Sequence, residues 1–191
     1  MKYWIAAPGF ALALAACDAS QAPPTGEAAP AAAQITGFGH AGGEDLFGYY
    51  LPTQPVQVGN YRLDHIHVGD GQAFLAWESG DRMETYGPVM LEFSDVTSPQ
   101  ASNELGQEFH TRSIRVLPRA YRIGDGDFRF VGAHPEVGEV VMDGQLDLAQ
   151  LEAEKATNGR PQDEAHPVLR MSAQIGAQAF RNLSFTWFGG D

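Results

Sequence analysis

The sequence predicts a single all-β domain, built as an antiparallel β-sandwich or barrel with one short helix near residues 147–158. Apolar segments that alternate with polar residues recur at roughly ten-residue spacing, which is typical of sandwiches and barrels. Turn residues separate these segments, and the chain contains 22 glycines and 12 prolines. The length of 191 residues fits one domain, because chains usually divide only beyond about 200–250 residues.

The first residues predict an export signal. Lys2 supplies a positive start, and the apolar run from Ile5 to Ala15 is too short to span a bilayer, which is the layout of a secretory signal peptide. The segment Leu14-Ala15-Ala16-Cys17 resembles the lipobox of bacterial lipoproteins. The resemblance implies that the lipoprotein-processing machinery removes residues 1–16 as a signal peptide and that Cys17 then carries lipid. The alternative is an ordinary signal peptide that is cut near Ala16.

Residues 17–34 are expected to form a lipidated tether rich in alanine and proline, followed by the β domain of residues 35–191. After Cys17, residues 18–34 hold seven alanines, three prolines and only two charges. Such a stretch cannot bury enough surface to offset its ordering entropy. The lipid would hold the exported protein at the periplasmic face of a membrane. Asp18 resembles the inner-membrane retention signal of enterobacterial lipoproteins and favours that membrane, with the outer membrane as the alternative.

Charge and cysteine content exclude several classes of function. The chain has 24 acidic and 12 basic residues and a net charge of −12. This balance disfavours nucleic acid as a partner, because neutralising phosphates requires basic patches. The single cysteine excludes an internal disulfide framework, a cysteine-based zinc site and an iron–sulfur cluster. No apolar run reaches the roughly 18 residues of a membrane-spanning helix.

Two segments in the first half of the domain predict strands. Residues 73–77 are apolar on both faces, which favours a strand in the interior of the domain. Val89, Leu91 and Phe93 alternate with polar or smaller residues, as in a half-buried strand.

Two consecutive hairpins are predicted between residues 121 and 146. Asp125-Gly126 is the dipeptide of a type I′ turn, and it pairs Ile123 with Phe128 and Tyr121 with Phe130. A second turn at residues 134–138 pairs Phe130 with Met142 and Arg129 with Asp143. The apolar positions of one face form the predicted core of this region: Tyr121, Ile123, Phe128, Phe130, Val140, Met142 and Leu146.

The single predicted helix follows these hairpins. Asp147 caps it, Gln150 stands three residues later as in a capping box, and Asn158-Gly159 supplies the left-handed stop. Leu148 and Leu151 mark its apolar edge. Two strands, residues 168–175 and 180–188, complete the domain. Phe180 is out of phase with the later apolar residues, which a bulge near Asn182 would correct.

The segment Asp64-His65-Ile66-His67 is the sharpest candidate for a functional site. Residues two apart in a strand point the same way, so His65 and His67 project together and can hold one divalent metal ion. Tyr61 and Leu63 are expected to share that face and to shelter the site. The alternative is a solvated or core-satisfied pair of histidines.

With Gly59, the histidine spacing resembles the first half of the metal motif of cupins, a β-barrel family that binds metal through three histidines and a glutamate. Gln72 stands where the glutamate is expected, and Gly80 lies one residue beyond the pattern. The second cupin motif has no counterpart with the right spacing. The resemblance implies a metal-dependent enzyme that uses His65 and His67.

Arg122 and Arg129 form the second candidate site. The hairpin register places them directly opposite each other, where like charges repel. An anion bound between the two guanidinium groups would compensate the repulsion. The alternative is a surface charge stripe that includes Asp143.

Three functions follow from these patterns. The first is a lipid-anchored, non-enzymatic binding or interaction module without a cofactor. The second is the cupin-like metal enzyme, and the third is a structural envelope lipoprotein without a small ligand. No catalytic residue is predicted otherwise, because the sequence contains no Gly-x-Ser-x-Gly elbow.

Overall fold

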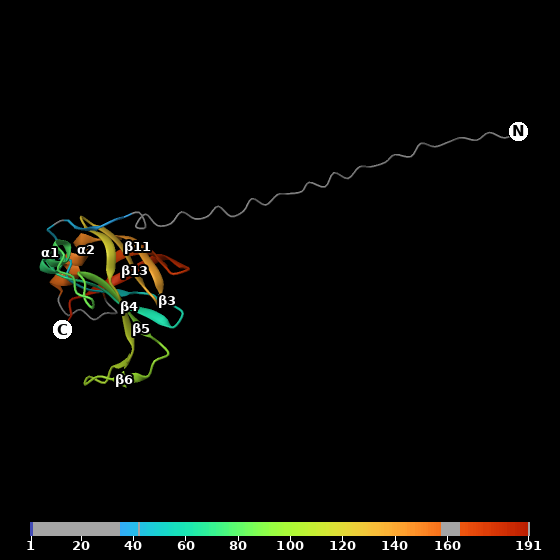
Figure 1. Cartoon of the computed structure of the whole chain (residues 1–191), viewed down its shortest axis with the longest axis horizontal. Helices are drawn as coiled ribbons and strands as arrows, with labels where there is room; N and C mark the ends of the chain where they lie inside the picture. Colours follow the sequence, from blue (N-terminus) through green and yellow to red (C-terminus); the bar gives the residue numbers. More distant parts are fainter. Residues whose placement is uncertain (2–34, 42, 158–164, 191) are drawn as a thin grey trace.

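The computed structural model describes residue 1 and residues 35–41, 43–157 and 165–190 (Figure 1). Apart from residue 1, the predicted signal peptide, Cys17, Asp18 and the tether lie outside the described residues. The Asn158-Gly159 helix stop lies outside them as well.

The described residues form thirteen strands and two helices. In chain order these are β1 (Phe38–His40), β2 (Gly48–Pro52), β3 (Gln57–Val58), β4 (Tyr61–Val68), α1 (Gly71–Ser79), β5 (Val89–Asp95), β6 (Gln100–Ser102), β7 (Glu108–His110), β8 (Ser113–Val116), β9 (Pro118–Gly124), β10 (Asp127–His134), β11 (Gly138–Leu146), α2 (Leu148–Ala156), β12 (Pro167–Ile175) and β13 (Gln178–Phe188).

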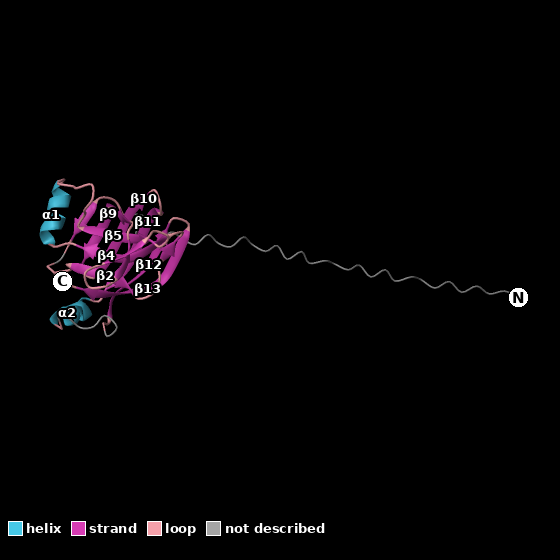
Figure 2. Ribbon diagram, turned by 90° about the horizontal axis from the view of Figure 1, so that it is seen from below, coloured by secondary structure: helices cyan, strands magenta, loops and turns pink. Residues whose placement is uncertain are grey.

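Eleven strands form one sheet in the order β1-β9-β10-β11-β12-β13-β2-β4-β5-β8, with β3 paired to β4. The β1–β9 pair is parallel, and the other pairs of this sheet are antiparallel. Leu117 alone separates β8 from β9, so one bent segment pairs with β5 before the bend and with β10 after it. The sheet therefore curls into a half-barrel (Figure 2).

The two helices and a small hairpin lie outside the curl. Both helices lie at the same end of the strands in Figures 1 and 2. β6 and β7 pair only with each other and project from the body (Figure 1).

The hydrophobic core fills the inside of the curled sheet. Its largest fully buried side chains are Tyr50, Phe74, Phe93, Tyr121, Phe128, Phe130 and Phe185. Burying a phenylalanine side chain contributes about 1.5–3 kcal/mol to folding. All buried residues of the core cluster lie between Leu46 and Phe185, so the core of the described part of the chain lies within residues 35–191.

The predicted hairpin registers are confirmed. Asp125 and Gly126 both have positive φ, 52° and 84°, as a type I′ turn requires. Ile123 faces Phe128 and Tyr121 faces Phe130. In the next hairpin Phe130 faces Met142 and Arg129 faces Asp143. The predicted core residues of this region are all buried.

The predicted bulge at Asn182 is also confirmed. Met171 pairs with Leu183, but Ala173 pairs with Phe180, so the register shifts by one residue between these pairs. Asn182 lies at this extra position of β13 and has a positive φ of 55°. The bulge returns Leu183 and Phe185 to the core face.

The strand predicted over residues 73–77 is wrong, because these residues belong to helix α1. The Asp70 side chain caps the helix by accepting a hydrogen bond from the Ala73 amide at 2.9 Å, and Gly80 ends it in the left-handed conformation. Phe74 and Trp77 are buried, while Leu75 is exposed. A short apolar run does not distinguish a strand from a helix by periodicity, and here the two capping residues decide.

The predicted helix near residue 147 is confirmed as α2, so the domain has two helices among its described residues rather than one. The Asp147 carboxylate accepts a hydrogen bond from the Gln150 amide at 3.0 Å. The Gln150 side chain donates to Glu154 instead of returning to the cap, so only half of the capping box forms. Leu151 is buried against the core.

Candidate binding site on the outer face of the sheet

A bulge in β4 decides which way the histidines point. Leu63 pairs with Phe93 and His65 pairs with Glu92, so Asp64 is an extra residue in the ladder. Tyr61 and Leu63 face the core before the bulge, and Ile66 and Val68 face it afterwards. The prediction that Tyr61 and Leu63 share the histidine face is therefore wrong, because alternation does not continue through a bulge.

His65 and His67 instead lie on the outer face of the sheet. Phe188 of β13, Tyr49 of β2, His67 of β4 and Met90 of β5 form one cross-strand row of direct partners. A second row runs from His65 through Glu92 to Arg115 of β8. We call these residues, together with Phe47 and Tyr86, the outer patch.

Aromatic rings surround the two imidazoles. The Tyr49 ring centroid lies 5.1 Å from the centroid of His65 and 5.1 Å from that of His67. Tyr86 approaches His67 at 5.4 Å, and Phe47 does so edge-on at 6.1 Å. The histidine pair thus lies in an apolar, ring-lined setting on the outside of the sheet.

His67 is buried although it does not face the core. The residue is only 4% exposed, and its Nδ1 atom has no hydrogen-bond partner within residues 35–41, 43–157 and 165–190. A buried polar atom without a partner costs about 1–3 kcal/mol. If this position had only a structural role, an apolar ring would fill it without that loss of stability.

Burial keeps both imidazoles neutral. It lowers the pKa of His65 below the usual 6.5 and outweighs the opposite influence of Glu92 and Asp64. Burial also lowers the pKa of His67, and the neighbouring His65 and Arg115 act in the same direction. At neutral pH each ring therefore keeps an unprotonated nitrogen that can accept a hydrogen bond or bind a metal.

The charged end of the patch is held by an ion pair. Arg115 Nε lies 3.0 Å from Glu92 Oε2, and the Ser113 hydroxyl donates to Glu92 Oε1 at 3.1 Å. Arg115 also donates to the Thr85 carbonyl at 3.4 Å, which ties the loop carrying Tyr86 to the sheet. Both oxygens of the Glu92 carboxylate are thus already engaged.

The remaining residues of the cupin resemblance lie away from the histidines' strand. Gln72 is exposed on α1, and Gly80 caps the end of that helix. Within the part of the chain that the structure describes, no group of three or more His, Cys, Asp or Glu residues could hold a metal ion. The structure brings His65 and His67 to one face and adds no such third ligand.

The arginine pair forms as predicted. Arg122 faces Arg129 across β9 and β10. Arg129 lies 3.9 Å from the Asp127 carboxylate and 3.7 Å from that of Asp143. Two carboxylates thus compensate the like charges, which favours the charge-stripe interpretation.

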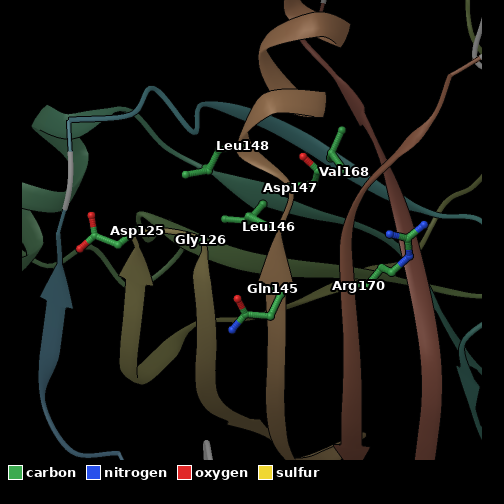
Figure 3. A pocket seen from close by; sticks show the side chains of 8 residues that line it. All are labelled: Asp125, Gly126, Gln145, Leu146, Asp147, Leu148, Val168 and Arg170. Atoms are coloured by element: carbon green, nitrogen blue, oxygen red, sulfur yellow. The ribbon is translucent and has the colours of Figure 1, made fainter.

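A separate depression of about 500 Å³ lies where β11 leads into α2 (Figure 3). Asp125 and Arg170 stand on opposite sides of it, and Leu146 and Leu148 lie between them. The carboxylate of Asp147, which also lines it, already caps α2. Its charged residues are all exposed, so none of them is a buried polar group like His67.

The sequence pattern does not identify Tyr49, Tyr86 and Met90 as neighbours of the two histidines. The alternation of Val89, Leu91 and Phe93 does place Met90 and Glu92 on the opposite face. Their pairing with His67 and His65 depends on the bulge at Asp64, which the sequence does not mark.

Of the helices in the described residues, neither is long and apolar enough to cross a membrane. Comparison of the chain with protein-family models, with curated proteins and with solved structures finds no match in any of the three.

Proposed function

We propose that the chain is an exported lipoprotein, anchored at the periplasmic face of a membrane by lipid on Cys17, whose β domain is a non-enzymatic binding module. The outer patch is its contact surface. The lipobox-like segment before Cys17 supports the anchoring, and the Ala/Pro-rich residues after it would hold the domain away from the lipid.

One observation carries the binding role. His67 is buried outside the core, with an Nδ1 atom that lacks a partner among the described residues. Aromatic rings beside a neutral imidazole supply apolar contact area together with a hydrogen-bonding or metal-binding atom, the usual composition of ligand sites.

The anchoring is tested by labelling cells that express the full chain with a palmitate analogue. We expect label on the wild-type protein and none on Cys17→Ser, which should leave the membrane fraction. Label that persists in Cys17→Ser would contradict the lipoprotein proposal.

The binding role is tested on residues 35–191 by thermal unfolding with chitotriose, inorganic phosphate and Zn²⁺ as separate probes. A rise in Tm with at least one probe that Tyr49→Ala abolishes would support a ligand site at the outer patch. Leu75→Ala, an exposed change on α1, is the control. An unchanged Tm with all three probes would favour the structural envelope role.

A further inference from the structure

We propose that His65, His67 and Met90 form a binding site for a soft monovalent cation of the copper(I) class. This inference rests on the binding role proposed above and names its ligand class. It adds the thioether sulfur of Met90 to the two imidazoles, a type of ligand that lies outside the histidine, cysteine and carboxylate groups considered above.

The three side chains share one face of neighbouring strands. Met90 is the direct antiparallel partner of His67, and side chains of such partners start about 4.5–5.5 Å apart, with diagonal neighbours at about 7–8 Å. His65 is the diagonal neighbour of Met90, within reach of a long flexible side chain. Met90 is 6% exposed but does not belong to the core that contains Val89 and Leu91, so its thioether lies on the histidine face.

The donor set selects the cation. Two imidazole nitrogens and one thioether sulfur suit copper(I), since thioether ligands prefer soft ions. Magnesium and calcium require oxygen ligands, and the carboxylate of Glu92, the direct partner of His65, is engaged by Arg115 and Ser113.

The surroundings favour a single positive charge. Glu92, the direct partner of His65, is neutralised by its ion pair with Arg115, so this carboxylate adds little attraction for a divalent ion over a monovalent one. The Tyr49 ring lies 5.1 Å from both imidazoles and places aromatic surface beside the proposed site.

Methionine also fills gaps in apolar surfaces, so the experiment must separate packing from ligation. Residues 35–191 are suited to it because the only cysteine of the chain is Cys17, and no thiol can compete. The protein is titrated anaerobically with copper(I) against the chromophoric chelator bicinchoninate. Silver(I) is titrated in parallel as a monovalent ion that is not oxidised in air.

We expect one equivalent of copper(I) and of silver(I) to bind. Met90→Leu, which conserves volume, should weaken both at least tenfold with Tm nearly unchanged, and His65→Gln should weaken both as well. Met83→Leu is the matched control, because Met83 is 58% exposed outside the three-residue site. X-ray absorption of the copper complex should contain a sulfur scatterer that is lost in Met90→Leu.

The proposal is overturned if the wild-type protein binds neither ion, or if Met90→Leu binds both as tightly as the wild type does. Neither result affects palmitate labelling at Cys17 or the response to chitotriose and phosphate. The failure of the copper site is therefore distinguishable from the failure of the proposed function.

Discussion

Met90 lies directly opposite His67 in the β4–β5 pair, on the side of the sheet that faces away from the core. The relationship exists because one extra residue, Asp64, interrupts the ladder between Leu63 and His65. Without that residue, the strand could not bury Tyr61 and Leu63 at one end and Ile66 and Val68 at the other. The bulge thus completes the core and assembles the outer patch with one backbone irregularity.

Acidification is expected to destabilise the domain through the two histidines. Their pKa values are lowered in the folded state, so the unfolded chain binds more protons once the pH falls below about 6.5. The contribution of the two neutral histidines to the free energy of unfolding is complete above that pH. It is lost as the pH falls towards their pKa values in the folded state. Urea unfolding at pH 7.5 and 5.5 measures the loss, and His67→Phe should reduce it. His110→Gln serves as the control, and an equal loss in wild type and His67→Phe would contradict the prediction.

Removing the cap of α1 is expected to lower the free energy of unfolding by about 1 kcal/mol. Asp70→Ala deletes the carboxylate that accepts a hydrogen bond from the Ala73 amide. Asp81→Ala, at an exposed position after the helix, should stay within about 0.5 kcal/mol of the wild type. Equal effects of the two variants in urea titrations would show that the cap does not stabilise α1.

The bend between β8 and β9 depends on a close backbone approach. A Cβ atom added at Gly132 would lie 2.7 Å from the Leu117 carbonyl oxygen. Gly132→Ala should therefore destabilise the domain by about 1–3 kcal/mol, as overpacking does. Gly71→Ala is the control, since a Cβ there meets nothing within 4 Å. A Tm for Gly132→Ala that equals the wild-type value would contradict the close approach.

Replacing Arg122 tests whether the arginine pair is a surface charge stripe or an anion-binding site. Arg122→Gln removes one of two facing cations and should change stability by less than about 1 kcal/mol, because the pair is at the surface. With the stripe interpretation, phosphate and sulfate leave the Tm of the wild type unchanged. A rise in Tm with either anion that Arg122→Gln abolishes would establish an anion site instead.

Several local features could be predicted because their causes are local. The type I′ turn at Asp125-Gly126 follows from two residues that tolerate positive φ, and it fixes the pairs on both sides of it. Asp147 caps α2 because its side chain reaches an amide three residues ahead. The out-of-phase Phe180 revealed the bulge at Asn182, since one phase of each strand must remain in the core.

The all-β class, two hairpin registers, the helix that begins at Leu148 and the shared direction of His65 and His67 could all be predicted from sequence patterns. Three features depend on the folded chain: residues 73–77 are helical, the sheet curls through the bend at Leu117, and the histidines lie beside Met90 and Tyr49 rather than in the core. Turns and caps depend on neighbours within a few residues. Which face of β4 is buried depends on β5, more than twenty residues away, and that pairing fixes the position of the bulge.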